Sequence, residues 1–493
     1  MTIAAKRLLA FDLGAESGRA ILGRIGGDKL SLEVLHRFNN RPVKVQGAVY
    51  WDVLSLYSEI LDGLRRCASQ GAIDSVGIDT WGVDFALIGA DGALLSNPRH
   101  YRDPHTEGIM DEAFKKVSRS DIFAQTGLQF MRFNSLFQLI ALQRNCSPLL
   151  DVADRFLMMP DLFNYFLTGV QVNEFSNATT SQLYDPRRGD WARGLCRAFG
   201  LPERIFGTIV APGSVVGNLR PEVAGETGLA AIPVIAPATH DTGSAVAAVP
   251  ARGDSWAFIS SGTWSLMGAE LPAPLINDKV LEHNFTNEGG VNGSSRFLKN
   301  VMGLWLVQEC RRSWERAGKS FGYDELARAA ESAPAFTSIV DPDHPSFMLP
   351  DDMPTAIRAF CANHGQQAPE EPGAVVRCIM ESLALRYRWV LDRLEELLGR
   401  KFESIHVVGG GSQNAFLCQC TADACNREVL AGPVEATAIG NVLLQAMGLG
   451  LLGSIAEGRE LVRRSFDVKS YTPRNASAWG EAYERFLALP SLQ

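Results

Sequence analysis

The sequence lacks the features of several large protein classes. It has no Lys- or Arg-rich tract, and its 47 basic residues are outnumbered by 55 acidic ones, which gives a net charge of −8. A nucleic-acid binder or a protein held on an anionic membrane usually has the opposite balance. Low-complexity segments are also missing, and 46% of the residues are hydrophobic, which excludes wholesale disorder. We therefore predict a folded globular protein, and 493 residues suffice for two or three domains.

Disulfide frameworks and long apolar runs are missing too. The nine cysteines are an odd number without framework spacing, so we expect reduced thiols. The apolar run at 8–11 is too short for a signal peptide. The longest charge-free stretch, 436–456, contains Asn441, Gln445 and four glycines, which favours a buried helix and a turn over a membrane span. We therefore expect a cytoplasmic protein without membrane attachment.

Strand-like and helix-like segments alternate along the chain, which is typical of an α/β fold. We expect paired strands at 7–13 with 19–25, at 73–79 with 83–89, and at 255–260 with 264–269. Helical periodicity appears at 53–68, 134–144, 160–167, 303–317 and 374–398. Both halves begin with a strand, a turn of small residues and a second strand. This pattern predicts two similarly built domains, residues 1–244 and 245–493, with a hinge near Gly243 and Gly253.

The first turn that is suited to an anion follows Asp12. Residues 14–18 are mostly small, so backbone N–H groups can approach a phosphate closely, and Asp12 could hold a divalent cation through water. The alternative is an ordinary β-hairpin turn capped by an aspartate.

Two further turns lie in the second half. Residues 260–265 form a hydroxyl-rich turn that could hold a phosphate or could be a plain hairpin. Residues 407–414 run from a buried strand through three glycines into a helix, where backbone amides and the positive helix end favour an anionic ligand.

The segment from His240 to Val246 offers a candidate base. Asp241 begins an Ala-rich helix, so it is either an N-cap or a general base that accepts a hydroxyl proton. Two other patterns carry less weight. The run at 317–320 resembles the end of a P-loop but has no first glycine or preceding strand. Cys418, Cys420 and Cys425 have no second ligand pair at zinc spacing, so we expect buried thiols.

Eight runs together resemble the FGGY family of carbohydrate kinases. They are GIDTWGVDF (77–85), MPDLF (159–163), NATT (177–180), HDT (240–242), SSGTWSLMG (260–268), TNEGG (286–290), LKNVMGLWL (298–306) and GGGSQN (409–414). They span nearly the whole chain in the expected order. The resemblance implies an α/β fold of two actin/hexokinase/Hsp70-like (ribonuclease H-like) domains around an interdomain cleft.

The resemblance also implies an activity and its residues. It implies transfer of the γ-phosphoryl group of ATP, with Mg²⁺, to O1 of L-rhamnulose. Asp241 matches the proton acceptor, and Asp12 matches the carboxylate near the magnesium. The nucleotide contacts fall on Ala15, Glu16, Ser17, Gly18, Arg19, Thr263, Gln308 and Gly410. The sugar contacts fall on Gly82, His240, Asp241, Thr242 and Asn300.

One departure and two alternatives accompany this assignment. Glu16 stands where the enteric pattern has Ser, and its carboxylate would meet the phosphates only through metal or water. The same fold could phosphorylate L-fuculose, L-xylulose or another ketose, because such sugars differ by few contacts. A non-enzymatic actin-like ATPase is the other class, although the polar residues Asp79 and Asp84 favour a sugar pocket. We expect a monomer that binds ATP and a ketose, and neither nucleic acid nor a membrane.

A separate prediction concerns Cys361 and Cys378. They flank the loop 363–373 between two helix-like segments, so a helical hairpin would bring them close together. The sequence leaves open whether they are bonded.

Overall fold

The computed structural model describes residues 5–490 and divides the chain into two compact units. The first unit is built from the chain up to Pro250, from Glu270–Phe297 and from Ala436–Phe466. The second consists of Ala251–Ala269, Leu298–Glu435 and the chain from Asp467 onward. The chain thus returns twice to the first unit, whereas the sequence led us to expect a single division after residue 244.

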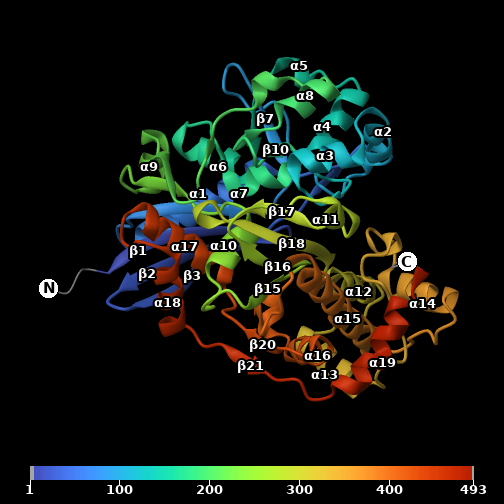
Figure 1. Ribbon diagram of the computed structural model, residues 1–493. Coiled ribbons are helices and arrows are strands. Elements are labelled where there is room, and N and C mark those ends of the chain that lie inside the picture. Colours follow the sequence, from blue (N-terminus) through green and yellow to red (C-terminus); the bar gives the residue numbers. More distant parts are fainter. Residues whose placement is uncertain (1–4, 491–493) are drawn as a thin grey trace. The chain divides into compact units, whose positions relative to one another are not determined.

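A six-stranded sheet in the order β13-β14-β6-β1-β2-β3 forms the centre of the first unit (Figure 1). Its strands are β1 (Lys6–Leu13), β2 (Ser17–Gly26), β3 (Lys29–Asn39), β6 (Ser75–Thr80), β13 (Ser214–Asn218) and β14 (Pro233–Ala236). The first three strands form an antiparallel meander, and β6 and β14 run parallel to β1. The last six residues of β1 are all buried, as expected for a central strand covered on both faces.

Helices cover both faces of this sheet. They include α1 (Val53–Ser69), α6 (Met159–Thr168), α10 (Asp241–Ala247) and α17 (Ala436–Gly448). On β2, Ala20 lies against Gly63 of α1, whereas Gly23 lies against Val442 of α17. Because side chains three residues apart in a strand point to opposite faces, α1 and α17 cover opposite faces. Figure 1 shows α17, near the end of the chain, beside the first strands.

Short elements surround this core. The strands are β4 (Val43–Val45), β5 (Ala48–Tyr50), β7 (Phe85–Gly89), β8 (Ala153–Met158), β9 (Asn173–Glu174), β10 (Tyr184–Asp185), β11 (Asp190–Trp191), β12 (Ile209–Val210) and β17 (Thr286–Gly289). The helices are α2 (Ile109–Lys116), α3 (Arg119–Thr126), α4 (Ser135–Arg144), α5 (Leu149–Val152), α7 (Phe175–Ala178), α8 (Arg193–Phe199), α9 (Pro221–Thr227), α11 (Asp278–Glu282) and α18 (Ile455–Ser465).

The second unit also has a central sheet, in the order β18-β16-β15-β19-β20-β21. Its strands are β15 (Trp256–Ser261), β16 (Trp264–Leu271), β18 (Ser295–Met302), β19 (Ser404–Val408), β20 (Glu428–Ala431) and β21 (Lys469–Tyr471). Its helices are α12 (Trp305–Arg316), α13 (Tyr323–Ser332), α14 (Met353–Asn363), α15 (Pro372–Leu398), α16 (Ala415–Cys425) and α19 (Ala476–Leu487).

The two sheets share one sequence of pairing directions. From β2 through β1, β6 and β14 to β13, the pairs are antiparallel, parallel, parallel and antiparallel. The same series describes the pairs from β16 through β15, β19 and β20 to β21. The prediction of two similarly built α/β halves therefore agrees with the topology of both units.

One strand pairing predicted from the sequence is wrong. Segment 83–89 was expected to pair with 73–79, but β7 pairs antiparallel with β8 in a separate two-stranded sheet. The reason lies in the connection, where Val83 has a φ of +67°. This left-handed residue turns the chain out of the central sheet directly after β6.

The two cysteines of the predicted pair lie on consecutive helices of the second unit. Cys361 is on α14 and Cys378 is on α15, both buried and both free thiols. The neighbouring Cys378 lowers the pKa of Cys361, whereas the neighbouring Cys361 and burial raise the pKa of Cys378.

Candidate active site

Two aspartates end neighbouring parallel strands at one edge of the first sheet. Asp12 of β1 and Asp79 of β6 are register partners, and their exposed fractions are 5% and 0%. Arg19 of β2 forms an ion pair of 2.7 Å with Asp12. Burial, and then the charge of Asp12, raise the pKa of Asp79 well above its ordinary value. Among the described residues, Oδ1 of Asp79 has no hydrogen-bond partner, so this edge is electrostatically suited to a cation.

The turn between β1 and β2 is held in place by Asn40. The Asn40 side chain donates to the carbonyl of Gly14 at 3.0 Å, and its backbone N–H donates to the carbonyl of Glu16 at 3.0 Å. A Cβ at Gly18 would lie 2.2 Å from the ring of Phe38. Close packing against Phe38 therefore requires a glycine at position 18. From the sequence we had expected a small residue there because an anion would approach the backbone.

The candidate base lies at the start of α10. His240 occupies the N-cap position and Asp241 is the first helical residue, so Asp241 is not the cap that one interpretation of the sequence predicted. Its Oδ1 accepts hydrogen bonds from the Thr242 N–H at 2.6 Å and from the Thr242 hydroxyl at 3.2 Å. The carboxylate is 30% exposed and can be reached by a substrate hydroxyl. Burial is the main cause that raises the pKa of Asp241, and the neighbouring His240 partly offsets it.

A buried glutamate fixes the segment that leads into α10. Glu174 is 0% exposed, and its Oε2 accepts from the Thr239 N–H at 2.9 Å and from the Thr239 hydroxyl at 2.7 Å. The same carboxylate accepts from the N–H and hydroxyl of Ser176, and the Ser176 hydroxyl in turn accepts from the His240 N–H at 3.1 Å. One carboxylate therefore joins β9 and α7 to the backbone that carries the candidate base.

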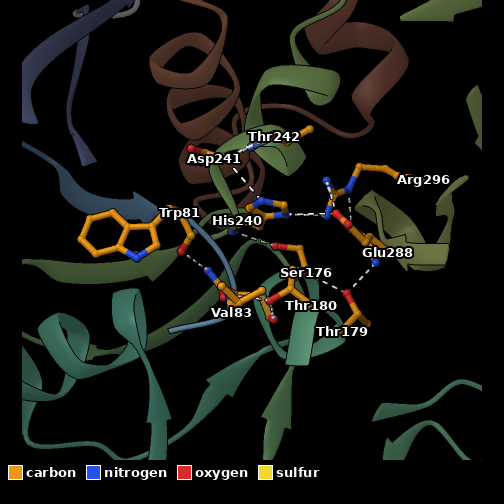
Figure 2. Close-up of polar contacts among 12 residues, drawn as sticks. Trp81, Val83, Ser176, Thr179, Thr180, His240, Asp241, Thr242, Glu288 and Arg296 are labelled. Carbon is orange, nitrogen blue, oxygen red and sulfur yellow. Dashed lines mark hydrogen bonds and ion pairs between the residues drawn. The ribbon is translucent and has the colours of Figure 1, made fainter. Parts of the chain in front are cut away.

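Asn177 brings the candidate sugar contacts of the first unit together. Its side-chain amide donates to the carbonyls of Trp81, at 3.4 Å, and Thr239, at 3.3 Å. Close by, the Thr180 hydroxyl accepts from the Val83 N–H at 2.9 Å (Figure 2). Thr180 also lies against Gly82, where a Cβ would be 3.0 Å from it. The segments at 81–83 and 239–242 are thus fixed next to each other by the run at 177–180.

An aromatic stack lies behind Trp81 in the first unit. The rings of Trp51 and Trp81 are 4.1 Å apart, and both indole N–H groups donate to Oδ2 of Asp84, at 2.6 and 3.0 Å. Gln138 donates to Oδ1 of Asp84 at 2.8 Å. Burial raises the pKa of Asp84 to about 7. The two tryptophan side chains next to Gly82 are therefore held in place by their hydrogen bonds to a single carboxylate, that of Asp84.

Two of the predicted nucleotide contacts lie close together in the second unit. The carbonyl of Thr263, in the β15–β16 turn, accepts from the N–H groups of Gly303 at 3.1 Å and Trp305 at 3.2 Å. These bonds fix the start of α12, which carries Gln308 one turn later. The buried Oε1 of Gln308 has no hydrogen-bond partner among residues 5–490, as expected of an atom that meets a ligand.

The glycine-rich turn after β19 packs against the same region. Gly409 has a φ of +81°, and a Cβ on Gly411 would lie 2.0 Å from the Ser261 hydroxyl, so both positions require glycine. Gly410 instead faces open space, with no atom within 4 Å of a Cβ placed there. Asn300, a predicted sugar contact, lies on β18 in the second unit.

The donor chemistry at the edge of the first sheet fits Mg²⁺. Across the described residues, no group of three His, Cys, Asp or Glu side chains is placed to hold a metal alone. Nucleotide-bound Mg²⁺ does not need such a group, because it keeps several waters and uses one or two carboxylates together with phosphates. Asp12 and the unpartnered oxygen of Asp79 supply oxygen ligands of that kind.

Some functional candidates were missed by the sequence reasoning. Glu174 and Arg296 lie outside all eight runs that resemble the family, so neither had a signal in a single sequence. Glu288 belongs to the TNEGG run, which pointed to the family but not to a role for the glutamate. Asn441 appeared only as a polar residue within an apolar stretch.

Both halves of the chain match models of one protein family. Residues 7–248 match the N-terminal domain, and residues 257–449 match the C-terminal domain, of the FGGY family of carbohydrate kinases. The chain belongs to this family of ATP-dependent sugar kinases.

Curated relatives match the chain from end to end. A protein of Bacteroides thetaiotaomicron named Rhamnulokinase is 50% identical over 482 residues, which is 98% of this chain and 99% of the relative. A protein of the same name from Pectobacterium atrosepticum is 42% identical over 490 residues, which is 99% of this chain and 97% of the relative.

Solved structures of sugar and polyol kinases share the fold. A gluconate kinase from Lactobacillus acidophilus matches with a TM-score of 0.80 at 15% identity, covering 99% of this chain and 98% of the other. The Plasmodium falciparum glycerol kinase with ADP matches with a TM-score of 0.76 at 17% identity, covering 98% of each chain. Between residues 5 and 490, no helix is both long and apolar enough to cross a membrane.

Proposed function

We propose that the chain transfers the γ-phosphoryl group of ATP to O1 of L-rhamnulose, forming L-rhamnulose 1-phosphate and ADP. The observation that carries this proposal is the 50% identity, over 98% of the chain, to the Bacteroides protein named Rhamnulokinase. That match extends through both units, so it includes every candidate site residue.

Asp241 is the proposed proton acceptor. Its carboxylate is 30% exposed at the start of α10, so a sugar hydroxyl can reach it. Burial raises its pKa and makes it a stronger base, and the adjacent His240 favours its ionised form. In the proposed step, Asp241 takes the proton of the O1 hydroxyl as that oxygen attacks the γ-phosphorus and ADP leaves in line.

The proposed sugar contacts position O1 for this transfer. Gly82, His240 and Thr242 lie around Asp241 in the first unit, fixed by Asn177 and Glu174, and Asn300 would contribute from the second unit. Holding the hydroxyl against its acceptor also favours the sugar over water, which is the competing nucleophile.

The nucleotide contacts are proposed on both units. In the first unit they are Ala15 and Glu16 of the β1–β2 turn, followed by Ser17, Gly18 and Arg19 at the start of β2. In the second unit, the unpartnered Oε1 of Gln308 and the open face of Gly410 support contacts there. Thr263 is the third proposed contact, and its carbonyl is bonded to the start of the helix that carries Gln308. Glu16 would approach the phosphates through metal or water.

Mg²⁺ is proposed to accompany ATP, and Asp12 would hold it at the end of β1. When bound, the cation neutralises charge on the transferring phosphates. Arg19 fixes the Asp12 carboxylate through the 2.7 Å ion pair. Because ATP is supplied inside cells, we also propose that the reaction takes place in the cytoplasm.

The test is a steady-state comparison of L-rhamnulose, L-fuculose and L-xylulose with MgATP. We expect the highest kcat/KM with L-rhamnulose, by roughly 10–200-fold, the range typical of close analogues. A clear preference for another ketose would replace the substrate while keeping the kinase chemistry. ATP hydrolysis that no ketose stimulates would instead support the actin-like ATPase.

A further inference from the structure

The position of the candidate base depends on the main chain that precedes it. The polar contacts of the Asp241 carboxylate are with its chain neighbours, because Thr242 donates to it and Nε2 of His240 lies 3.4 Å from its Oδ1. Such contacts move together with the aspartate and do not fix it against the rest of the first unit. The groups that hold residues 239 and 240 therefore set where the carboxylate lies.

Every polar group of Thr239, two residues before the base, is hydrogen-bonded. Its N–H and its hydroxyl donate to Oε2 of Glu174, at 2.9 and 2.7 Å. Its carbonyl accepts from the Thr80 N–H at 2.9 Å and from the Asn177 side-chain amide at 3.3 Å. Thr239 is 0% exposed, so water does not compete for these bonds. The chain therefore enters α10 from a fixed point.

The residue next to the base is reached through a serine hydroxyl. The His240 N–H donates to the Ser176 hydroxyl at 3.1 Å (Figure 2). That hydroxyl in turn donates to Oε2 of Glu174 at 2.5 Å. A Cβ at Gly243, in the first turn of α10, would lie 3.4 Å from the Ser176 side chain, so the helix begins next to this serine. Glu174 thus holds both residues that precede Asp241, one directly and one through Ser176.

The ring of His240 is held by a different group of side chains (Figure 2). Its Nδ1 lies 3.1 Å from Nη2 of Arg296 and 3.2 Å from Oε2 of Glu288. Glu174 acts on the main chain of His240 and not on its ring. Support for the ring and support for the main chain therefore come from separate residues, and the second can be tested alone.

Glu174 is suited to this task by its charge and burial. It is 0% exposed, and besides the three bonds above it accepts from the N–H groups of Ser176, at 2.8 Å, and Asn177, at 3.3 Å. Burial raises the pKa of Glu174, and the hydrogen bonds from Ser176 and Thr239 offset part of the rise. Both oxygens accept from backbone N–H groups, as in an ionised carboxylate. Hydrogen bonds to an ionised acceptor are roughly twice as strong as those between neutral groups.

We propose that Glu174 is a positioning residue for phosphoryl transfer, which fixes the main chain of residues 239 and 240 and thereby the place of the Asp241 carboxylate against the attacking hydroxyl. This inference rests on the proposed function of Asp241. Ser176 acts together with Glu174, because it extends the contact to His240.

The first experiment replaces the carboxylate by an amide of the same shape, in Glu174→Gln. Whichever way the amide turns, its NH₂ group faces a backbone N–H that had donated to the carboxylate. We expect kcat to fall roughly 10–100-fold, because a small displacement of a reacting group has a cost of that order. The KM for ATP should stay within about twofold, since the affected step is proton transfer. Wild-type kcat in the folded variant would overturn the proposal.

A double-mutant cycle decides whether Glu174 acts through the base. In an Asp241→Asn background the group to be positioned is already gone, so Glu174→Gln should lower kcat further by less than about threefold. The same loss of kcat in both backgrounds would overturn the positioning role and leave Asp241 as the base. Wild-type kcat in Asp241→Asn alone would overturn the base as well, so the two failures are distinguishable.

A milder variant covers the case in which Glu174→Gln folds poorly. Ser176→Ala removes the hydroxyl between Glu174 and the His240 N–H and creates no buried charge. We expect a fall in kcat of roughly 2–10-fold, the factor that corresponds to one hydrogen bond between neutral groups. Wild-type kcat in Ser176→Ala would likewise contradict the role of this link.

Glu395→Gln is the matched control for the loss of a buried carboxylate. Glu395 lies on α15 in the second unit, is 5% exposed, and accepts from the Phe402 N–H at 3.1 Å and from Nη2 of Arg427 at 2.8 Å. Urea denaturation should show lower stability, whereas kcat of the folded chain should equal that of wild type. A fall in kcat as large as that of Glu174→Gln would overturn the proposal. Activities are compared with whichever ketose is best, so a failure of the rhamnulose assignment is seen separately.

Discussion

The side-chain amide of Asn441 donates a 2.6 Å hydrogen bond to Oδ2 of Asp79, although 362 residues separate them. Asn441 lies on α17 and Asp79 ends β6, so the contact joins a late helix to the edge that carries the candidate site. Gln445, one turn further along α17, extends the link by donating to Asn441 and to the carbonyl of Leu9. A buried polar ladder therefore sets the position of α17 on the sheet.

Gly440 should be the most sensitive glycine in this helix. A Cβ there would lie 1.8 Å from the carbonyl oxygen of Ser244 in α10, which is backbone and cannot rotate away. We expect Gly440→Ala to lower the free energy of unfolding by at least about 2 kcal/mol, because overpacking forces the backbone to shift. Activity should fall as well, since α10 begins with Asp241.

Urea denaturation of wild type and variant checks this, with Gly225→Ala as the control. Gly225 lies in α9, and no atom is within 4 Å of a Cβ placed there. The control should gain up to about 1 kcal/mol from helix propensity. Equal stability of Gly440→Ala and wild type would contradict the close packing of α10 and α17.

Asp241→Asn should damage chemistry and spare folding. The change is nearly isosteric, and loss of a general base typically costs ~10²–10⁴-fold in rate. We expect kcat to fall into that range while ATP affinity and Tm stay close to wild type. Asp111→Asn, an exposed aspartate in the first turn of α2, is the matched control and should leave kcat unchanged. A variant that retains more than about a tenth of wild-type kcat would disprove the assignment of the base.

Asp84 should titrate near neutral pH and be reported by its two tryptophans. Burial raises its pKa from 3.8 to about 7, so the folded chain holds a proton there that the unfolded chain has lost. The stabilisation that comes from protonated Asp84 is therefore fully present below pH 3.8 and is lost as the pH rises to about 7. Between about pH 5.5 and about pH 8, the free energy of unfolding of wild type should fall by about 2 kcal/mol relative to that of Asp84→Asn.

Two measurements test this titration. Tryptophan fluorescence of wild type should change with a midpoint near pH 7, because Trp51 and Trp81 donate to Asp84. The change should be missing in Asp84→Asn. A stability difference between the two proteins that is independent of pH would show that Asp84 keeps one charge state throughout.

The cysteines should differ sharply in reactivity. Cys146 is exposed and the other eight are buried, and all nine are free thiols. A thiol reagent should therefore modify one cysteine rapidly in the native chain, and Cys146→Ser should abolish that fast phase. Denaturation without reductant should release nine thiols. A count of seven, two fewer, would mean that Cys361 and Cys378 are bonded.

Periodicity and turn chemistry predicted much of the fold. The helix expected at 374–398 is α15, Pro372–Leu398, because its apolar face repeats over many turns. The pairing predicted for 83–89 was wrong because β propensity does not indicate which strand is the partner. The left-handed backbone of Val83 turns this segment away from the central sheet. The return of Ala436–Phe466 to the first unit was likewise invisible, since it depends on long-range packing.

The candidate site was predictable only in part. Asp12, Gly82 and Asp241 lie in stretches of sequence that indicate a ligand site or a family. Glu174 and Arg296 lie in no such stretch, and their contacts form only when the chain folds. Gly18 shows the opposite case, because a residue that looks suited to a ligand is required by the ring of Phe38. The type of a residue indicates which chemistry it can carry out, whereas a residue that holds another in place is recognised only by the side chains and backbone groups that it contacts in the fold.

The divided composition of the first unit has a consequence for biosynthesis. β1 and β6 leave the ribosome early, but α17, which covers one face of them, is completed only at Gly448. Because domains tend to fold as units during synthesis, the first unit must wait until the second has almost emerged. Through most of translation, the nascent chain carries an uncovered apolar sheet face, which is the kind of surface that chaperones bind.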